Sequence, residues 1–142
     1  MKNVIFIFLM FTLSSCIQKE VKGIKLGHNL YDTQGWSYNR ILCKRIDKIL
    51  QKDPIALKEL INGSYGGAAG DYDIGEVVVQ IICKIGESEF IELAVQLNSE
   101  ERNHLRQYIE AGLEYGNEYF FELKNKRNIK KQFPKLEIVL QK

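Results

Sequence analysis

The chain has 142 residues, of which 45% are hydrophobic and 27% are charged, and it contains only two prolines. This length allows one domain with a real core but not two, and the composition excludes a disordered or fibrous protein. The formal net charge is only +2, so the distribution of charge along the chain is more informative than the total.

The first residues have the layout of an export signal. Lys2 supplies a positive charge, residues 4–13 form an apolar run interrupted only by Thr12, and two serines lead to Cys16. The run is about half of the roughly 20 residues that a membrane-spanning helix needs, so a permanent transmembrane anchor is the weaker interpretation. A core helix is weaker still, because no charged residue gives the run a solvent-exposed side.

The sequence Leu13-Ser14-Ser15-Cys16 resembles the lipobox of bacterial lipoproteins. The resemblance implies that residues 1–15 are a signal peptide removed before Cys16, and that the Cys16 thiol carries a diacylglycerol. Two acyl chains hold a protein stably on a membrane, whereas one chain gives only marginal binding. No Asp follows Cys16, so the resemblance favours the outer membrane of a bacterial envelope and leaves its periplasmic and surface faces both open.

The rest of the chain is predicted to be a tether followed by one domain. Residues 16–35 comprise the lipidated Cys and a flexible tether, because they are polar, contain three glycines and show no sustained apolar period. Residues 36–142 are predicted to form an all-α domain, a compact bundle of five to seven short helices.

Apolar residues at spacings of three and four predict the helices, and local signals mark several of their ends. Asp53-Pro54 is expected to start one helix, and Asn98 or Ser99 is expected to be the N-cap of another. Gly86 is expected to end the helix before it. The β-branched residues before Gly86 leave a buried strand as the alternative to a helix there. Helices are predicted over 38–50, 54–62, 73–85, 90–97 and 99–115, and a last apolar segment of open type follows Pro134.

Four glycines lie between residues 63 and 70. Glycines let backbone N–H groups approach a phosphate, so a phosphate-binding loop is one interpretation. The run lacks a Gly-Lys-Ser/Thr motif and a preceding strand, and Asp71 and Asp73 directly after it would repel an anion. A connection between two helices is therefore the preferred interpretation.

Lipid at Cys16 would leave two cysteines in an oxidising compartment, Cys43 and Cys83. If the helices that carry them pack together, a Cys43–Cys83 disulfide would stabilise the fold by about 4 kcal/mol. The alternative is that each is an unbonded, small hydrophobic residue.

Charge is segregated along the chain. Basic residues exceed acidic ones by five over 17–52 and by six over 124–142, whereas acidic residues exceed basic ones by ten over 53–123. One interpretation is that the basic ends fold over the acidic middle and neutralise it, and another is that an acidic face captures a basic protein partner. A third is that the basic tail over 124–142 approaches anionic lipid headgroups in a salt-dependent way. The acidic face would be formed by five carboxylates: Asp71, Asp73, Glu76, Glu87 and Glu89.

Motifs for catalysis or cofactor binding are absent from the sequence. The carboxylate pairs lie near predicted helix starts, where capping explains them, and His104 is predicted on the solvated side of a helix. Cys43, Cys83, His28 and His104 show no metal-ligand spacing. No catalytic residue, metal ligand or cofactor is therefore predicted, and nucleic acid is a poor partner for an exported, lipid-anchored protein.

Three functions follow in order of preference. The first is a non-enzymatic, membrane-anchored module that binds a protein partner, in its most concrete version an immunity-type lipoprotein that neutralises a toxin. This version rests on analogy, since such proteins are often small, helical, acidic on one face and free of catalytic motifs. The second is a structural or assembly lipoprotein of an envelope complex. The third is an enzyme whose site forms only in three dimensions, around the glycine-rich run and the carboxylates of Asp71, Asp73 and Glu76.

Overall fold

The computed structural model describes residues 17–32, 34–116 and 128–142. In this part of the chain eight helices and one two-stranded sheet are present, which confirms the all-α fold. Seven of these helices belong to the predicted domain, within the five to seven expected, and the eighth lies in the segment predicted to be a tether. The helices are α2 (His28–Asp32), α3 (Gly35–Leu50), α4 (Pro54–Ile61), α5 (Ala68–Ile85), α6 (Glu87–Ala94), α7 (Ser99–Tyr115), α8 (Ile129–Gln132) and α9 (Pro134–Leu140), and the strands are β1 (Glu20–Val21) and β2 (Ile24–Lys25).

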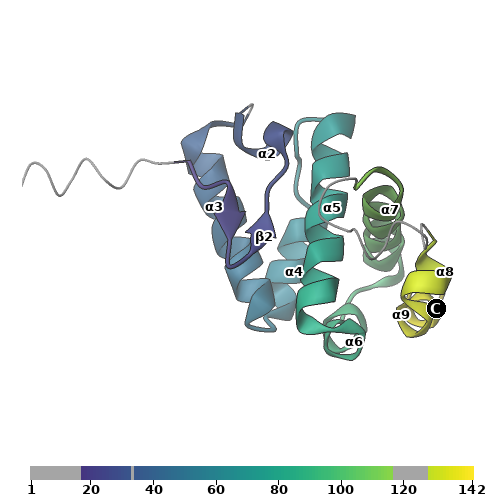
Figure 1. Ribbon diagram of the computed structural model, residues 1–142. Helices are drawn as coiled ribbons and strands as arrows, with labels where there is room; N and C mark the ends of the chain where they lie inside the picture. The colour runs from purple at the N-terminus through teal and green to yellow at the C-terminus, as the bar shows by residue number, and fades with distance from the viewer. Residues whose placement is uncertain (1–16, 33, 117–127) are drawn as a thin grey trace, which may run out of the picture.

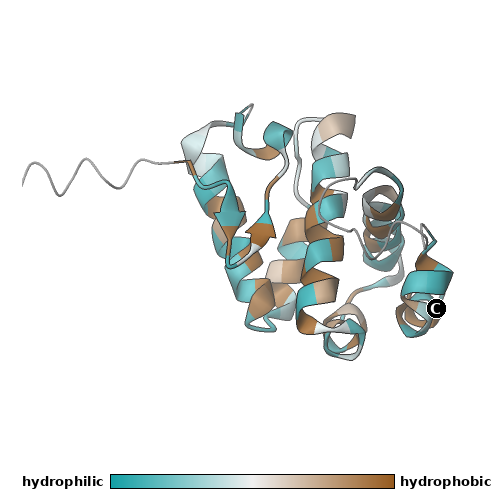
Figure 2. Cartoon of the chain, in the orientation of Figure 1, coloured by the Kyte–Doolittle hydropathy of each residue, from teal (hydrophilic) through white to brown (hydrophobic). Residues whose placement is uncertain are grey.

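Helix α5 passes through the middle of the molecule, with α3 and α4 on one side and α7 on the other (Figure 1). Its residues 77–82 are all buried, so the helix is surrounded by the bundle there, and much of its ribbon has the colour of hydrophobic residues (Figure 2). The prediction of a helix here rather than a strand is confirmed. The helix begins at Ala68, earlier than predicted, because Gly67 rather than Asp71 or Asp73 is its N-cap, and it ends at Gly86, whose φ is 92°.

Local capping signals set the ends of the two helices that flank α5. The Asp53 carboxylate accepts the backbone N–H groups of Ile55 and Ala56, and Pro54 occupies the first position of α4, as predicted. At the start of α7, Asn98 and Glu101 form a reciprocal capping box. These caps satisfy backbone donors that would otherwise be left unpaired at the start of each helix.

Residues 17–32 do not form the tether that the sequence predicted. β1 and β2 pair as an antiparallel hairpin, α2 follows, and the segment packs on α3 and α5. The Gln80 side chain on α5 accepts the backbone N–H of Lys25 and donates to its carbonyl oxygen, at 2.7 and 2.8 Å. The segment has no apolar period, yet it is anchored by four buried residues: Val21, Ile24, Leu26 and Leu30.

The segment after Pro134, whose type the sequence left open, is helix α9. It packs against α6 and α7 and buries Leu136 and Leu140 (Figure 1). Pro134 at its first helical position costs no hydrogen bond. Across the described ranges, none of the helices combines the length and the hydropathy that crossing a membrane would need.

Candidate functional site

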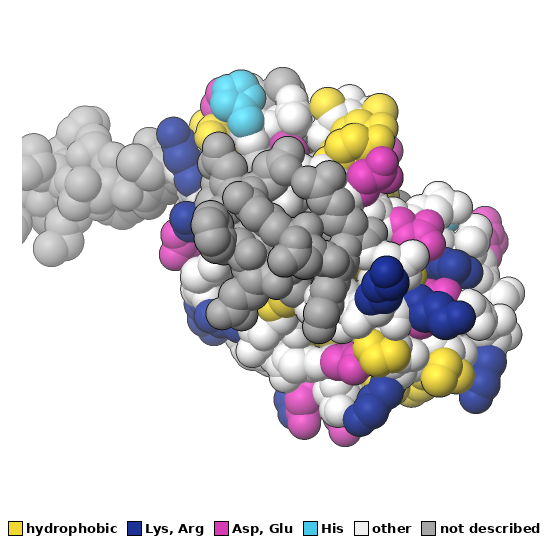
Figure 3. Space-filling model, turned by 45° about the vertical axis from the view of Figure 1, so that its right-hand side comes forward, with side chains coloured by type: hydrophobic (Ala, Val, Ile, Leu, Met, Phe, Trp, Pro, Cys, Tyr) yellow, Lys and Arg dark blue, Asp and Glu magenta, His cyan; other side chains and the backbone are white. Residues whose placement is uncertain are grey.

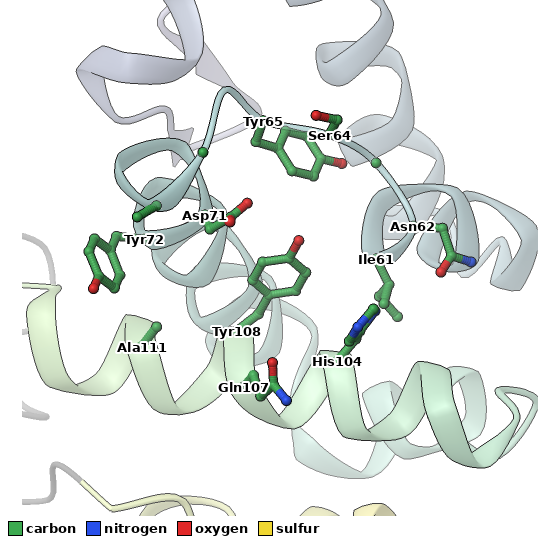
Figure 4. A pocket seen from close by; sticks show the side chains of 13 residues that line it. Ile61, Asn62, Ser64, Tyr65, Asp71, Tyr72, His104, Gln107, Tyr108 and Ala111 are labelled. Carbon is green, nitrogen blue, oxygen red and sulfur yellow. The ribbon is translucent and has the colours of Figure 1, made fainter.

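A pocket of about 630 Å³ opens where the end of α4, the connection over 63–67, the start of α5 and the middle of α7 meet (Figure 4). This volume lies within the usual range for binding sites of small molecules or single side chains. The described residues that line it include one carboxylate, one imidazole and three phenols, contributed by Asp71, His104, Tyr65, Tyr72 and Tyr108. The pocket is therefore polar and aromatic rather than purely apolar.

Tyr65 holds the glycine-rich connection in place. Its side chain is fully buried, and its hydroxyl donates to the Leu60 carbonyl oxygen at 2.6 Å, which ties the connection to the end of α4. The Gly70 backbone lies against the Tyr65 carbonyl so closely that any Cβ at residue 70 would overlap that oxygen. Gly66 and Gly67 adopt φ values of 83° and 90°, which other residues rarely adopt. The glycines thus let the chain turn tightly from α4 into α5.

The carboxylate of Asp71 points into the space between this connection and α7, and the hydroxyl of Tyr108 points toward the same space (Figure 4). No hydrogen bond or ion pair joins the Asp71 carboxylate to another described residue. Burial raises the pKa of Tyr108 to about 12, and the negative charge of Asp71 adds to the increase. Tyr108 is therefore a neutral phenol at physiological pH, and its hydroxyl keeps its proton.

Tyr38 of α3 lies next to Tyr65, one of the residues that line the pocket. Its ring meets that of Tyr65 edge to face, with 6.1 Å between ring centroids, and its hydroxyl donates to the Ser64 carbonyl oxygen. Burial raises the pKa of Tyr38, and the Arg45 guanidinium opposes this effect. Arg45 itself is paired with Glu59, at 3.2 Å between Nε and Oε2. Arg45, the basic side chain on the α3 side of the pocket, is therefore already paired with the Glu59 carboxylate.

His104 and Gln107 contribute the outer wall from exposed positions on α7. The structure records no hydrogen bond between His104 and Asp71, and in Figure 4 the imidazole lies apart from the carboxylate. Within the described ranges no group of three or more His, Cys, Asp or Glu side chains is placed to hold a metal ion.

The five carboxylates predicted as one partner-binding face are not brought together as a free surface. Asp71 lines the pocket, whereas the Asp73 carboxylate accepts the backbone N–H of Asn29 at 2.8 Å on the side of α2. Glu76 is half-buried on α5. On the side of the molecule seen in Figure 3, acidic and basic side chains are interspersed.

The two remaining carboxylates of that set also have partners within the chain. Glu87 accepts the backbone N–H groups of Lys135 and Leu136, at 2.8 and 2.9 Å, and so caps the start of α9. Glu89 forms an ion pair with Lys52. The alternative in which the acidic middle is neutralised within the fold therefore describes these contacts better than a continuous acidic face.

Cys43 and Cys83 are not joined in a disulfide. Cys43 points into the core from α3, whereas Cys83 is exposed on α5. The prediction required both side chains to face one interface between their helices, but one faces inward and the other outward. Burial raises the pKa of the Cys43 thiol to about 11, as expected for a small core residue.

The predicted lipid-bearing residue, Cys16, and the predicted signal peptide over 1–15 lie outside the described residues. Sequence reasoning missed the part that Tyr65 and Tyr108 play in the pocket, because it treated the first as part of a connection and the second as core. The signal that was available is the run from Tyr65 to Asp71, in which a phenol and a carboxylate enclose three glycines.

No protein-family model matches the chain, and searches of curated proteins and of solved structures also find no match.

Proposed function

We propose that this protein is a lipid-anchored module of a bacterial envelope that binds a protein partner without catalysing a reaction. The observation that carries the proposal is the pocket beside α7, in which the Asp71 carboxylate faces open space among tyrosine side chains. A carboxylate of this kind is available to a partner, because no described residue satisfies it. The lipobox-like sequence ending at Cys16 supports anchoring on a membrane, with the outer membrane as the preferred address.

The concrete version of the proposal is an immunity-type lipoprotein that binds and neutralises a toxin arriving in the envelope. A small helical domain is sufficient for such a role, since blocking a toxin needs a complementary surface and no chemistry of its own. Lipid at Cys16 would hold the domain in the compartment that the toxin enters.

Site-specific crosslinking in intact cells tests the partner-binding function. A photoreactive amino acid is placed at Ala111, which lines the pocket, in the full-length anchored protein. The matched control carries the same group at Gln141, which is exposed after α9 and does not line the pocket. The expected result is one specific protein adduct at residue 111 that is missing at residue 141. Equal adducts at both positions, or none at residue 111, would contradict the proposal.

Deletion of the gene tests the immunity version. Cells that lack the protein are grown in competition with toxin-bearing neighbours and compared with cells complemented by the wild-type gene. Survival is expected to fall in the deletion strain and to recover on complementation. Unchanged survival against every competitor that delivers toxins would remove the immunity version, while the crosslinking result would still decide whether a partner binds.

A further inference from the structure

We infer that the pocket between the 63–67 connection, α5 and α7 binds an arginine side chain of the protein partner, with the Asp71 carboxylate as its counter-charge. The inference rests on the proposed partner-binding function and deepens it, because it names the chemistry that the partner must present. It combines the charge, the aromatic surface and the size of the pocket.

Charge is the first support. Among the described residues that line the pocket, Asp71 is the acidic one, and neither Lys nor Arg lines it. Arg45 acts on Tyr38 and Tyr65 from the α3 side, but its guanidinium is paired with Glu59. Asp71 therefore gives the lining a negative charge that an incoming cation would balance.

Aromatic surface is the second support. Tyr108 lies between Asp71 and the outer part of the pocket, and Tyr72 contributes an exposed ring at its edge (Figure 4). The ring of Tyr72 lies 4.6 Å from that of Tyr115, so it is held in a pair of rings rather than projecting alone. The faces of neutral phenols attract cations, and guanidinium groups also stack on them.

An anionic ligand fits this pocket less well. The pocket lies at the N-terminus of α5, where backbone N–H groups favour negative charge. Asp71 lies in the first turn of α5 and already supplies a negative charge at that end. A phosphate or a partner's carboxylate would have to approach the Asp71 carboxylate, which would repel it.

Shape favours arginine over lysine. Asn62, Ser64 and Gln107 also line the pocket, apart from the Asp71 carboxylate in Figure 4, and their amide and hydroxyl groups include oxygen acceptors. A planar guanidinium has five N–H donors that can reach several such acceptors at once, whereas an ammonium is a compact point charge. A volume of about 630 Å³ accommodates the side chain together with part of its backbone.

The direct test uses three short peptides: acetyl-Gly-Arg-Gly-amide and the same peptide with citrulline or lysine in place of arginine. Each is titrated into the full-length protein in detergent micelles, and NMR follows the resonances of His104 and Tyr108. Citrulline keeps the shape of arginine but lacks its charge, so it is expected to bind about tenfold or more weakly. Failure of the arginine peptide to bind, equal affinity for citrulline, or tighter binding of lysine would overturn the inference.

Two variants locate the binding to the pocket. Asp71→Asn removes the charge while keeping the size of the side chain, and is expected to weaken binding of the arginine peptide about tenfold or more. Glu92→Gln makes the same change of charge at an exposed position on α6, away from the pocket lining, and is expected to leave the affinity unchanged. Equal weakening in both variants would show general attraction between charges and would overturn the inference. The peptide comparison on the wild-type protein remains decisive if Asp71→Asn fails to fold.

The crosslinking at Ala111 separates this inference from the proposed function. A specific adduct in cells together with no preference for the arginine peptide would overturn the arginine site and leave the partner-binding function standing. Arginine-specific, Asp71-dependent binding with no adduct in cells would support the site and contradict the proposed function.

Discussion

Gly75 of α5 and Gly112 of α7 lie against each other, backbone to backbone, at the crossing of the two helices. A methyl group on Gly75 would lie 2.5 Å from the Tyr108 carbonyl oxygen and 2.8 Å from the Gly112 amide nitrogen, and one on Gly112 would overlap the Gly75 carbonyl. The absence of side chains at these two residues allows the helices to approach this closely. The same approach sets the position of α7, and therefore of Tyr108, against the start of α5.

Substitution of either glycine is expected to destabilise the fold. Alanine has a higher helix propensity than glycine, which favours Gly112→Ala slightly. The added methyl group, however, forces the backbones of α5 and α7 apart, so we expect a net loss of about 1–3 kcal/mol in the free energy of unfolding. The measurement is urea denaturation followed by circular dichroism. Glu114→Ala, at an exposed position two residues further along α7, should change stability by less than about 0.5 kcal/mol. A Gly112→Ala protein as stable as wild type would contradict the close contact.

Loss of the Glu87 carboxylate should loosen the C-terminal helix. Glu87→Ala leaves the N–H groups of Lys135 and Leu136 without the acceptor that caps α9, and should cost about 1–2 kcal/mol. Hydrogen exchange should accelerate at these two amides more than in α5. Glu92→Ala, exposed on the same helix as Glu87, is the matched control and should leave exchange in α9 unchanged.

The capping box at α7 should make stability depend on acid pH. Hydrogen bonding to the Asn98 backbone, followed by the interactions with Lys58, lowers the pKa of Glu101 in the folded state. The unfolded chain then binds the proton more tightly, so the stabilisation by Glu101 is complete above its unfolded pKa of about 4.3 and is lost as pH falls through the lower folded pKa.

The measurement for this prediction compares unfolding of the wild type and Glu101→Gln between pH 7 and pH 2. The wild type should be the more stable protein at neutral pH, and the gap should narrow as the carboxyl becomes protonated. A gap that stays constant over this range would show that the charge of Glu101 contributes nothing to the cap.

The two cysteines should differ in reactivity. In the folded protein N-ethylmaleimide is expected to modify the exposed Cys83 and to spare Cys43, because Cys43 is buried and its raised pKa keeps the thiol protonated. In denaturant both should react. Mass spectrometry of the peptides distinguishes the two sites, with Cys83→Ser as the control that should show no labelling in the folded state. Recovery of a Cys43–Cys83 cross-linked peptide would contradict the structure.

Cys16→Ala tests the anchoring that the lipobox-like sequence predicts. In bacteria fed radiolabelled palmitate, the wild-type protein should take up the label and sediment with membranes, whereas the variant should do neither. Ser15→Ala keeps a small residue before the cleavage point and should behave as wild type. Equal labelling of the wild type and Cys16→Ala would remove the lipoprotein proposal.

The sequence by itself determined the features that depend on neighbouring residues. Asp53-Pro54 caps α4, Asn98 pairs with Glu101 at α7, and Gly86 ends α5, because each of these signals acts over at most a few residues. The helical period before Gly86 also predicted the helix correctly, in spite of the strand propensity of its β-branched residues.

The tertiary structure alone decided which distant residues meet. Residues 17–32 have too few apolar side chains for a periodic pattern, yet they fold because α3 and α5 offer a surface on which to bury them. Glu87 meets the start of α9 across 48 residues, Cys43 and Cys83 face opposite ways, and Asp71 comes to line a pocket with Tyr108. These contacts depend on how the helices cross. The crossing of α5 and α7 is set by the contact between Gly75 and Gly112, two residues that no local sequence pattern relates to each other.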